Sequence, residues 1–429
     1  MNIAIAGLGT VGAEVARQLI HHQEVTAKRA GMALKVTAVS ARTEGRDRGF
    51  SMDGIAFVAN PVDLASRADV DMVVELIGGD EGPALNLIET ALNAGKSVVT
   101  ANKALLAKHG AGLARLAEEH DAYLAGEAAV AGGIPVLKML REGLSGNKIS
   151  RISGILNGTC NYILSTMETT GRSFEDVLAE AQELGYAEAD PSFDVDGIDA
   201  AHKLALLAAI GFGEVPNFDA ISITGIRQVS STDISSAEKI GYAIRLLAIV
   251  QKDGDSVLSS VKPTLVPLGS GLANVGGPLN AVEVHGAPLG SVIAIGPGAG
   301  AGATASAVLA DMVDIAAGRA APFFGMAAAD LSAPMGAAAP TGAKSCYYLR
   351  LTVQDRPGVL AEITSVLSDH NTSVEGMIQQ GNPADQKETA EIILTTHAVI
   401  PSDMDAAIAS IISLDAVITE PTVMMIASS

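Results

Sequence analysis

The feature that most constrains this fold is a glycine-spaced turn at the start of the chain. A strand-like run over residues 2–6 leads at once into a G-x-G-x-x-G turn that reads Gly7-Leu8-Gly9-Thr10-Val11-Gly12, and a helical pattern follows. The first glycine permits a tight turn, the second lets a ligand approach the backbone, and the third lets the helix pack on the strand. N–H groups at the helix start, including those of Thr10 and Val11, suit a pyrophosphate. The turn therefore predicts a dinucleotide site, and the structural alternative is a strand–helix turn without a ligand.

Alternating strands and helices extend this pattern to about residue 135. The expected strands are 2–6, 34–40, 71–77 and 97–100, and the expected helices are 11–29, 83–94 and 103–120. Such alternation is typical of a parallel sheet covered by helices. We therefore expect an α/β protein with an N-terminal Rossmann domain over residues 1–135, to which a helix at 305–318 returns.

The rest of the chain divides into three parts. Residues 136–304 mix helices with strands and predict an α+β domain; its expected helices are 174–184, 198–211 and 236–246, and its expected strands are 149–155 and 257–264. Residues 319–345 are rich in Ala, Pro and Gly, which is typical of a linker. Residues 346–429 follow the order strand, helix, strand, strand, helix, strand, and predict a small α+β domain of their own.

The end of the second strand bears on the choice of cofactor. An NAD enzyme usually places a carboxylate there, whereas this chain reads Val39-Ser40-Ala41-Arg42. Arg42 would pair with a 2′-phosphate, so NADP is favoured and NAD stays possible; the alternative is a solvated surface arginine. Lys103 follows another strand end and should lie at the same edge of the sheet, where open α/β sheets bind ligands.

A second cluster concentrates five carboxylates in a short segment, namely Glu188, Asp190, Asp194, Asp196 and Asp199. An EF-hand calcium loop is excluded, because Lys203 would occupy the position of its bidentate glutamate. On a helix from about residue 198, Asp199 and Lys203 are one turn apart, and apolar residues surround the lysine. Burial would lower the pKa of Lys203 and the carboxylates would raise it, which suits a proton donor or acceptor. The alternative is a surface ion pair.

Charge and cysteine content exclude several classes of protein. The chain has 28 basic and 48 acidic residues, a net charge of −20, which argues against nucleic-acid binding. Two cysteines, Cys160 and Cys346, suggest neither a disulfide framework nor a thiolate metal site. No signal peptide or membrane-spanning run is evident, so we expect a cytoplasmic protein.

Taken together, these motifs resemble the homoserine dehydrogenases that carry a C-terminal ACT domain. The resemblance spans nearly the whole chain and rests on the order and spacing of segments 7–12, 75–79, 100–103, 127–135, 155–159, 185–203 and 296–300. It implies NAD(P)-dependent interconversion of L-aspartate 4-semialdehyde and L-homoserine, in threonine, methionine and isoleucine biosynthesis. It also implies a catalytic and dimerisation domain over 136–304, a ferredoxin-like ACT regulatory domain over 346–429, and a homodimer or homotetramer.

The resemblance also implies roles for individual residues. Lys203 would be the general acid, Asp199 would orient it or the reacting oxygen, and Lys103 would steady the developing charge and contact the cofactor. The implied substrate-binding residues are Glu188, Asp194, Gly158 and Thr159, and Gly300 would lie in a loop that closes on the cofactor. Cys160 stands where the family has threonine or serine, which should alter packing rather than chemistry.

Two further sites follow from the same resemblance. A monovalent cation, expected to be sodium, would be bound by Glu127, Val130, Gly132 and Ile134; the alternative is a glycine turn capped by Glu127. The ACT domain would bind threonine as an effector, and the implied contacts are Asp355, Gly358, Val359, Leu360 and Asn371. The alternative is a dimerising module without a ligand.

Two other functions remain open from the residues alone. One is a dehydrogenase of a related amino-acid semialdehyde, and the other is a non-catalytic sensor of nucleotide and amino acid. A sensor would not need a half-buried proton-transfer lysine such as Lys203. An enzyme that reduces an acyl phosphate would need a cysteine nucleophile beside a histidine, and Cys160 has no such neighbour in the sequence.

Overall fold

The glycine turn joins β1 (Asn2–Ala6) to α1 (Thr10–His21) in the middle of a parallel sheet. The computed structural model describes residues 1–253, 256–333, 344–381 and 389–427. Its chain contacts define two units, Met1–Gly158 with Asp199–Ile221 and Leu279–Met335, and Thr159–Ile198 with Ser222–Pro278 and Gly336–Ser429. We call them the N-terminal unit and the C-terminal unit and describe each by itself.

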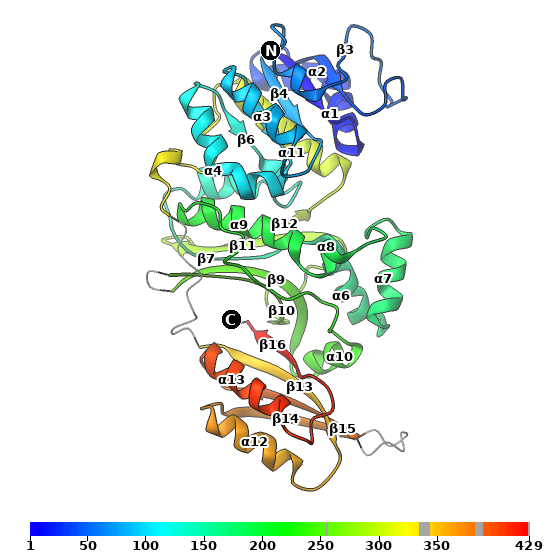
Figure 1. The fold of residues 1–429 in the computed structure, drawn as a ribbon, viewed down its shortest axis with the longest axis vertical. Helices are drawn as coiled ribbons and strands as arrows, with labels where there is room; N and C mark the ends of the chain where they lie inside the picture. The colour runs from blue at the N-terminus through cyan, green and yellow to red at the C-terminus, as the bar shows by residue number, and fades with distance from the viewer. Residues whose placement is uncertain (254–255, 334–343, 382–388, 428–429) are drawn as a thin grey trace. The chain divides into compact units, whose positions relative to one another are not determined.

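The N-terminal unit contains the six-stranded parallel sheet in the order β3-β2-β1-β4-β5-β6 (Figure 1). The strand order reverses at β1, which is where doubly wound sheets bind nucleotides. A second, antiparallel group in this unit has the order β12-β11-β7. Besides β1 and α1, the unit contains α2 (Gln23–Ala30), β2 (Lys35–Ser40), β3 (Ala56–Phe57), η1 (Pro61–Leu64), β4 (Met72–Glu75), α3 (Pro83–Asn93), β5 (Ser97–Thr100), α4 (Lys103–Glu119), β6 (Leu124–Ala125), η2 (Glu127–Ala129), α5 (Val136–Lys138), η3 (Met139–Gly143), β7 (Lys148–Ile155), α9 (Ile198–Phe212), β11 (Leu279–Ala287), β12 (Gly290–Pro297), α11 (Ala301–Ala316) and η4 (Ala328–Asp330).

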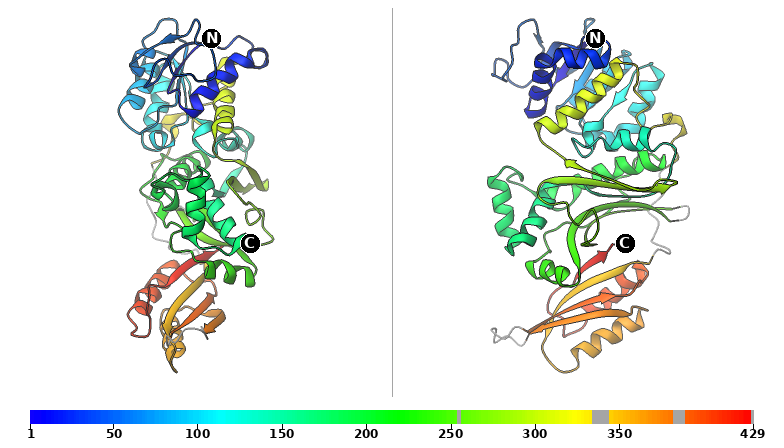
Figure 2. Two further views of the ribbon diagram at one scale, coloured as in Figure 1. Left: turned by 90° about the vertical axis from the view of Figure 1, so that its right-hand side faces the viewer. Right: turned by 180° about the vertical axis from the view of Figure 1, so that it is seen from behind.

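Helix α11 packs beside α1 on the parallel sheet, although the two are far apart in sequence (Figure 2). Its buried residues, such as Val308 and Met312, share one core with Ile5, Val15 and Leu19. This aliphatic core fixes the sheet edge on which the glycine turn lies. The packing is driven by removal of these apolar side chains from water.

The C-terminal unit contains a mixed sheet in the order β9-β10-β16-β13-β15-β14, with β8 also paired to β10. Its last four strands and two helices form the β-α-β-β-α-β arrangement that the sequence predicts. The elements are α6 (Gly158–Thr170), α7 (Phe174–Glu183), α8 (Ser192–Val195), β8 (Ser222–Ile223), α10 (Ser231–Lys239), β9 (Tyr242–Asp253), β10 (Ser256–Pro267), β13 (Cys346–Gln354), α12 (Val359–Asp369), β14 (Val374–Gly381), β15 (Thr389–Thr396), α13 (Pro401–Ile412) and β16 (Thr422–Ile426).

The fold class is confirmed, but several expected elements differ. The helix expected at 236–246 is wrong in its second half, because α10 ends at Lys239 and β9 begins at Tyr242 and pairs along its length with β10. The helix expected at 11–29 is two helices that meet at His22. The expected linker, 319–345, lies partly outside the described residues, and its role stays a prediction; Phe323 and Phe324 within it are buried.

The predicted domain boundaries stay predictions as well.

Among the residues that the structure describes, no helix combines the length and apolar character that a membrane crossing requires.

Candidate functional site

Close packing requires glycine at two positions of the glycine turn, Gly7 and Gly12, whereas the space at Gly9 is open. Gly7 has φ +94°, and a Cβ there would lie 2.4 Å from the carbonyl oxygen of Leu76. A Cβ on Gly12 would lie 1.9 Å from the carbonyl oxygen of Gly7. At Gly9 a Cβ would meet no atom within 4 Å. Packing therefore explains the first and third glycines, while the second leaves room for the approach of a ligand.

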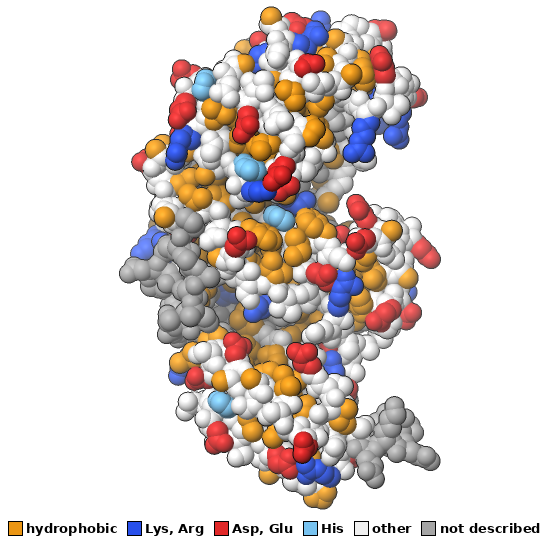
Figure 3. All heavy atoms as spheres, in the orientation of Figure 1, with side chains coloured by type: hydrophobic (Ala, Val, Ile, Leu, Met, Phe, Trp, Pro, Cys, Tyr) orange, Lys and Arg blue, Asp and Glu red, His pale blue; other side chains and the backbone are white. Residues whose placement is uncertain are grey.

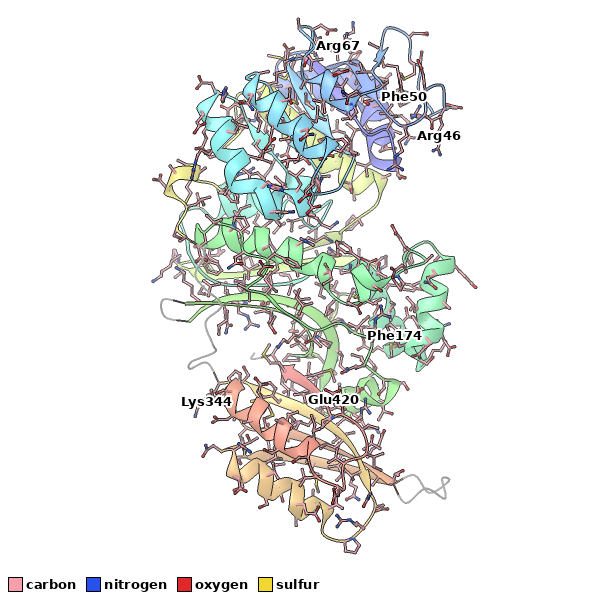
Figure 4. All side chains as sticks on the ribbon, in the orientation of Figure 1. Arg46, Phe50, Arg67, Phe174, Lys344 and Glu420 are labelled. Atoms are coloured by element: carbon pink, nitrogen blue, oxygen red, sulfur yellow. The ribbon has the colours of Figure 1, made fainter. Side chains whose placement is uncertain are left out.

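The loop after β2 is fixed to the glycine turn by an arginine that the sequence reasoning missed. Arg48 donates to the carbonyl oxygens of Thr43 (2.6 Å) and Arg46 (2.9 Å) and reaches that of Leu8 (3.4 Å). Arg42 is exposed in the same loop, whose residues Arg46 and Phe50 are labelled in Figure 4. Arg42 thus lies in a loop that Arg48 joins to the glycine turn, and its contact with the cofactor stays a prediction. In the sequence, Arg48 is the third of three closely spaced arginines, after Arg42 and Arg46, and this spacing is the signal that could have pointed to it.

The carboxyl ends of β4 and β5 are joined by a buried carboxylate, as their shared sheet edge predicts. Glu75 accepts hydrogen bonds from the Thr100 hydroxyl (2.6 Å) and from the main-chain N–H of Ile77 (2.6 Å). Asn102 caps α4 by accepting from Leu105 N (3.2 Å) and donates to the carbonyl oxygen of Gly79. These bonds fix the first turn of α4, which begins at Lys103.

Two lysines converge on one buried carboxylate in the N-terminal unit. Lys203 Nζ lies 2.7 Å from Asp199 Oδ2 and donates to the carbonyl oxygen of Leu156 at 2.7 Å. Lys103 Nζ lies 3.1 Å from Asp199 Oδ1. Asn157 Nδ2 donates to Asp199 Oδ2 at 2.8 Å. Lys203 and Asp199 are buried, at 9% and 6% exposure, so the surface ion-pair alternative is wrong.

The sequence predicted part of this cluster. Helix α9 begins at Ile198 as expected and brings Asp199 and Lys203 together by their spacing. The contact of Lys103 with Asp199 depends on the tertiary fold and was not predicted. Asn157 was not assigned a role, although it lies in the Asn-Gly-Thr segment that follows β7.

The environment of Asp199 favours its charged form. Burial by itself would raise its pKa, but the charges of Lys203 and Lys103 together with the hydrogen bonds from Lys203 and Asn157 outweigh burial. The pKa of Asp199 is therefore held well below its usual range. An ionised Asp199 orients both ammonium groups, one of them buried, and leaves the cluster with one net positive charge.

The predicted cation-binding loop packs against the glycine-rich loop that precedes α11. Ala131 and Gly132 have positive φ values of +54° and +48°, and Gly133 N donates to the carbonyl oxygen of Pro297 at 3.0 Å. A Cβ on Gly132 would lie 2.5 Å from the carbonyl oxygen of Gly298. Gly300, at φ +104°, begins the turn into α11. The loops that carry Gly132 and Gly300 are therefore neighbours.

The carboxylate of Glu127 already has main-chain partners. Its two oxygens accept from Leu137 N (2.8 Å) and Lys138 N (2.9 Å) at the start of α5, so it caps this short helix. Glu127 is 1% exposed, and burial together with nearby Asp311 raises its pKa to about 7. Val130 and Ile134 are buried. No group of three or more His, Cys, Asp or Glu side chains within the described ranges is arranged to hold a metal ion.

The acidic segment 185–198 belongs to the C-terminal unit, and most of its carboxylates have partners there. The Thr159 hydroxyl donates to the carbonyl oxygen of Tyr186 (2.6 Å) and contacts Asp194 Oδ2 (3.4 Å). Cys160 Sγ donates to the carbonyl oxygen of Asp194 (3.2 Å), and Asp196 pairs with Arg227 at 2.5 Å. Gly158, the other predicted substrate residue, begins α6.

Glu188 differs from its neighbours. Its side chain is exposed and makes no ion pair or side-chain hydrogen bond within the part of the chain that the structure describes. It is thus open to a cationic group of a ligand.

In the C-terminal βαββαβ region, the loop named by the sequence is a turn into α12. Gly358 caps the helix with φ +97°, and α12 begins at Val359 as predicted. The Val359 side chain is 3% exposed and belongs to the core of this region, while Asp355 and Asn371 are exposed. Leu360 packs at the edge of the same core. The side chain of Val359 is therefore not exposed to an effector, whereas those of Asp355 and Asn371 are exposed.

Comparisons with known proteins agree along the chain. Residues 7–127 match the NAD-binding domain of homoserine dehydrogenase, residues 135–313 match the homoserine dehydrogenase family, and residues 347–416 match the ACT domain. The homoserine dehydrogenase of Neisseria gonorrhoeae is 43% identical over 427 residues, which cover 97% of this chain and 96% of the relative.

Solved structures agree as well. A homoserine dehydrogenase from Thiobacillus denitrificans superposes with a TM-score of 0.92 at 41% identity, over 100% of this chain and 98% of that one. A hyperthermophilic archaeal homoserine dehydrogenase in complex with NADPH has a TM-score of 0.63 at 31% identity, over 73% of this chain and 97% of that one. The chain therefore belongs to the homoserine dehydrogenases, a family of nicotinamide-dependent oxidoreductases, in the form with a C-terminal ACT domain.

Proposed function

We propose that this chain reduces L-aspartate 4-semialdehyde to L-homoserine, reversibly, in the biosynthesis of threonine, methionine and isoleucine. The observation that carries the proposal is the convergence of Lys203 and Lys103 on Asp199. NADPH, when bound, supplies the hydride that adds to the aldehyde carbon. The Lys203 ammonium donates the proton that the carbonyl oxygen gains as its negative charge develops.

The supporting residues each have a distinct task in this mechanism. Asp199 stays ionised and holds the Lys203 ammonium in one direction, with the Leu156 carbonyl oxygen as the second fixed acceptor. Lys103, at 30% exposure, is the more accessible cation and stabilises the charge that develops on the oxygen. The net positive charge of the cluster favours an alkoxide-like transition state over the neutral aldehyde.

Substrate recognition is assigned to Glu188, Asp194, Gly158 and Thr159. An amino acid needs a carboxylate for its ammonium, and the unpaired carboxylate of Glu188 supplies one. The family resemblance supports the assignment of the other three residues.

We assign NADP as the preferred cofactor, with NAD possible. The end of β2 carries Arg42 in place of a carboxylate, and Arg48 fixes the same loop to the glycine turn. The archaeal relative in complex with NADPH supports this assignment. The open space at Gly9 fits the pyrophosphate.

We also assign a monovalent cation, sodium, to the loop of Glu127, Val130, Gly132 and Ile134. The positive φ values at Ala131 and Gly132 turn this loop sharply, and hard cations prefer oxygen ligands such as its carbonyl groups. A buried carboxyl whose pKa is raised to about 7 is one that a cation would hold in its charged form. The Glu127 side chain would then cap α5 and also balance the charge of the cation.

For regulation and assembly, we propose threonine as the effector of the ACT domain and a homodimer or homotetramer as the assembly. Both rest on the family resemblance and on the ACT match at 347–416. A mixed sheet whose edge strand β14 carries the exposed side chain of Met377 is suited to pairing with a second copy.

The proposal is tested by a spectrophotometric assay of the purified protein with homoserine and either NADP or NAD, with and without threonine. We expect NADP-dependent oxidation of homoserine. Lys203→Ala should lower turnover by a factor of about 10² or more, the scale of lost acid–base catalysis, and leave NADPH binding intact. Exposed Lys108 is a matched control, and Lys108→Ala should retain full turnover. Near-normal turnover of Lys203→Ala would overturn the mechanism.

A further inference from the structure

The backbone that carries Glu188 is held by one side chain of the preceding helix. Gln182 lies in the last turn of α7, and its Nε2 donates to the carbonyl oxygens of Glu188 (3.0 Å) and Ala189 (3.4 Å). A primary amide has two N–H donors, so both carbonyl groups can be bound at once. The side chain thereby closes the loop between the end of α7 and the acidic segment.

Other bonds fix the start of this loop but not the residues around Glu188. Tyr186 N and Ala187 N both donate to the carbonyl oxygen of Ala181, at 2.8 and 3.1 Å. Thr159 holds the carbonyl oxygen of Tyr186 from α6. Across the described ranges, Gln182 is the only group that binds the carbonyl oxygens of Glu188 and Ala189.

The carboxylates that follow Glu188 have partners within the segment or on neighbouring elements of the same unit. Asp190 accepts from Ser192 N at 3.1 Å, and Asp196 pairs with Arg227. Among the carboxylates of segment 185–198, all of which the structure describes, Glu188 is the one that combines an exposed, unpaired carboxylate with a main chain held by a side chain from outside the segment. This combination suits a preorganised binding group, since a loop that is already ordered loses less conformational entropy when a ligand binds.

We propose that Gln182 is a positioning residue for the substrate, and that it acts by holding the Glu188 main chain so that the carboxylate meets the substrate's ammonium group. This inference rests on the proposed function, in which Glu188 binds that group. Gln182 itself does not touch the substrate and takes no part in proton or hydride transfer. Its removal should therefore weaken amino-acid binding without changing the chemical step.

The test is steady-state kinetics of Gln182→Ala and Gln182→Glu, the second of which keeps the length but removes both N–H donors. The KM for homoserine should rise about tenfold in both variants, as for the loss of one positioned contact, while kcat and the KM for NADP change less than about twofold. Glu183→Gln, at the exposed end of the same helix, is the matched control and should behave as wild type. An unchanged KM for homoserine in the Gln182 variants, or an equal fall in kcat and in cofactor affinity, would overturn the proposal.

A double-mutant cycle with Glu188→Gln separates this role from general damage to the fold. If Gln182 acts through Glu188, the double variant should have the same homoserine KM as Glu188→Gln alone. If the increases in homoserine KM of the two single variants multiply in the double variant, Gln182 acts independently of Glu188 and the inference is overturned. A normal homoserine KM in Glu188→Gln would remove both the inference and the Glu188 assignment, while the Lys203→Ala assay would still report on the reaction.

Discussion

Two buried carboxyl groups of the N-terminal unit have opposite electrostatic environments. Asp199 is buried beside two ammonium groups, and these hold its pKa well below the usual range. Glu127 is buried beside a second carboxyl, Asp311, and its pKa is raised from 4.5 to about 7. The first group is therefore ionised wherever the enzyme is assayed, whereas the second titrates within that range. Of these two carboxyl groups, only Glu127 changes its charge near neutrality.

The raised pKa of Glu127 predicts a pH-dependent response to sodium. Because the folded-state pKa exceeds the unfolded value, the free energy of unfolding falls as pH rises from 4.5 to about 7. Above about pH 7 the carboxyl is ionised in both states, and the loss of free energy of unfolding, the penalty for ionising the buried group, is complete. That penalty is roughly 3 kcal/mol for a shift of this size. A cation that binds the charged carboxyl offsets it, so sodium should stabilise the protein more above pH 7 than below it.

The measurement is the apparent melting temperature in sodium chloride against choline chloride at equal ionic strength, at about pH 6 and about pH 8. We expect the sodium-specific increase to be larger at the higher pH. An equal increase at both pH values, or an equal effect of both salts, would argue against a sodium ion at Glu127.

At the scale of elements, helix α10 is tied to strand β13 through one carboxylate. Asp233 forms a capping box with Ser230, accepting from Ser230 N at 2.9 Å while the Ser230 side chain accepts from Asp233 N. Its Oδ1 accepts from the Tyr348 hydroxyl at 2.9 Å and from Arg350 Nε at 2.7 Å. Burial and the Asp233 charge together raise the pKa of Tyr348, which keeps it a donor. One side chain thus both starts a helix and joins it to a distant strand.

Loss of this carboxylate should destabilise the C-terminal unit. Asp233 is fully buried, and Asp233→Ala would leave Glu391, at 3.9 Å, as the one carboxylate paired with Arg350 among the described residues, at a cost of about 3 kcal/mol in the free energy of unfolding. Asp233→Asn retains acceptor capacity and should fall between this variant and wild type. Chemical denaturation measures both.

The control is an exposed ion pair of the same unit, Arg356 with Glu362. Their side chains are 42% and 39% exposed, so Glu362→Ala should cost less than about 1 kcal/mol. Equal effects of Asp233→Ala and Glu362→Ala would refute a structural role for the buried network.

Sequence patterns predicted the elements whose signals are local. The glycine turn, the start of α9 at Ile198 and the turn into α12 all depend on a few neighbouring residues, and all were predicted. The helix expected at 236–246 failed because the apolar run from Tyr242 is buried by pairing with β10, a non-local contact that periodicity does not reveal. The Ser230–Asp233 capping box was the missed local signal.

The same distinction holds within the candidate site. The spacing of Asp199 and Lys203 predicted their contact, and the shared sheet edge predicted that Lys103 would lie near ligands. The approach of Lys103 to Asp199, and the two bonds by which Glu127 caps α5, depend on how distant segments pack. Such contacts need the tertiary structure.

At the scale of the whole molecule, we assign a chemical role to few of the 48 acidic residues. On the face shown in Figure 3, Asp and Glu side chains are scattered over the surface with Lys and Arg between them. No single acidic patch on that face suggests a cationic partner. In a chain with an excess of 20 negative charges, these scattered side chains contribute solvation and mutual repulsion.

Mutual repulsion of this size predicts that the protein is stabilised by salt that does not bind to it. Near pH 8 the folded chain holds its excess charge at high density, and raising choline chloride from about 10 mM to about 200 mM shortens the screening length to below about 10 Å. The apparent melting temperature should then rise by a few degrees. Close to the isoelectric point, near 4.7, the net charge vanishes and the rise should disappear. A melting temperature that falls or stays constant with choline chloride near pH 8 would show that attractive pairs, such as Arg350 with Asp233, outweigh the repulsion, since screening weakens attraction and repulsion alike.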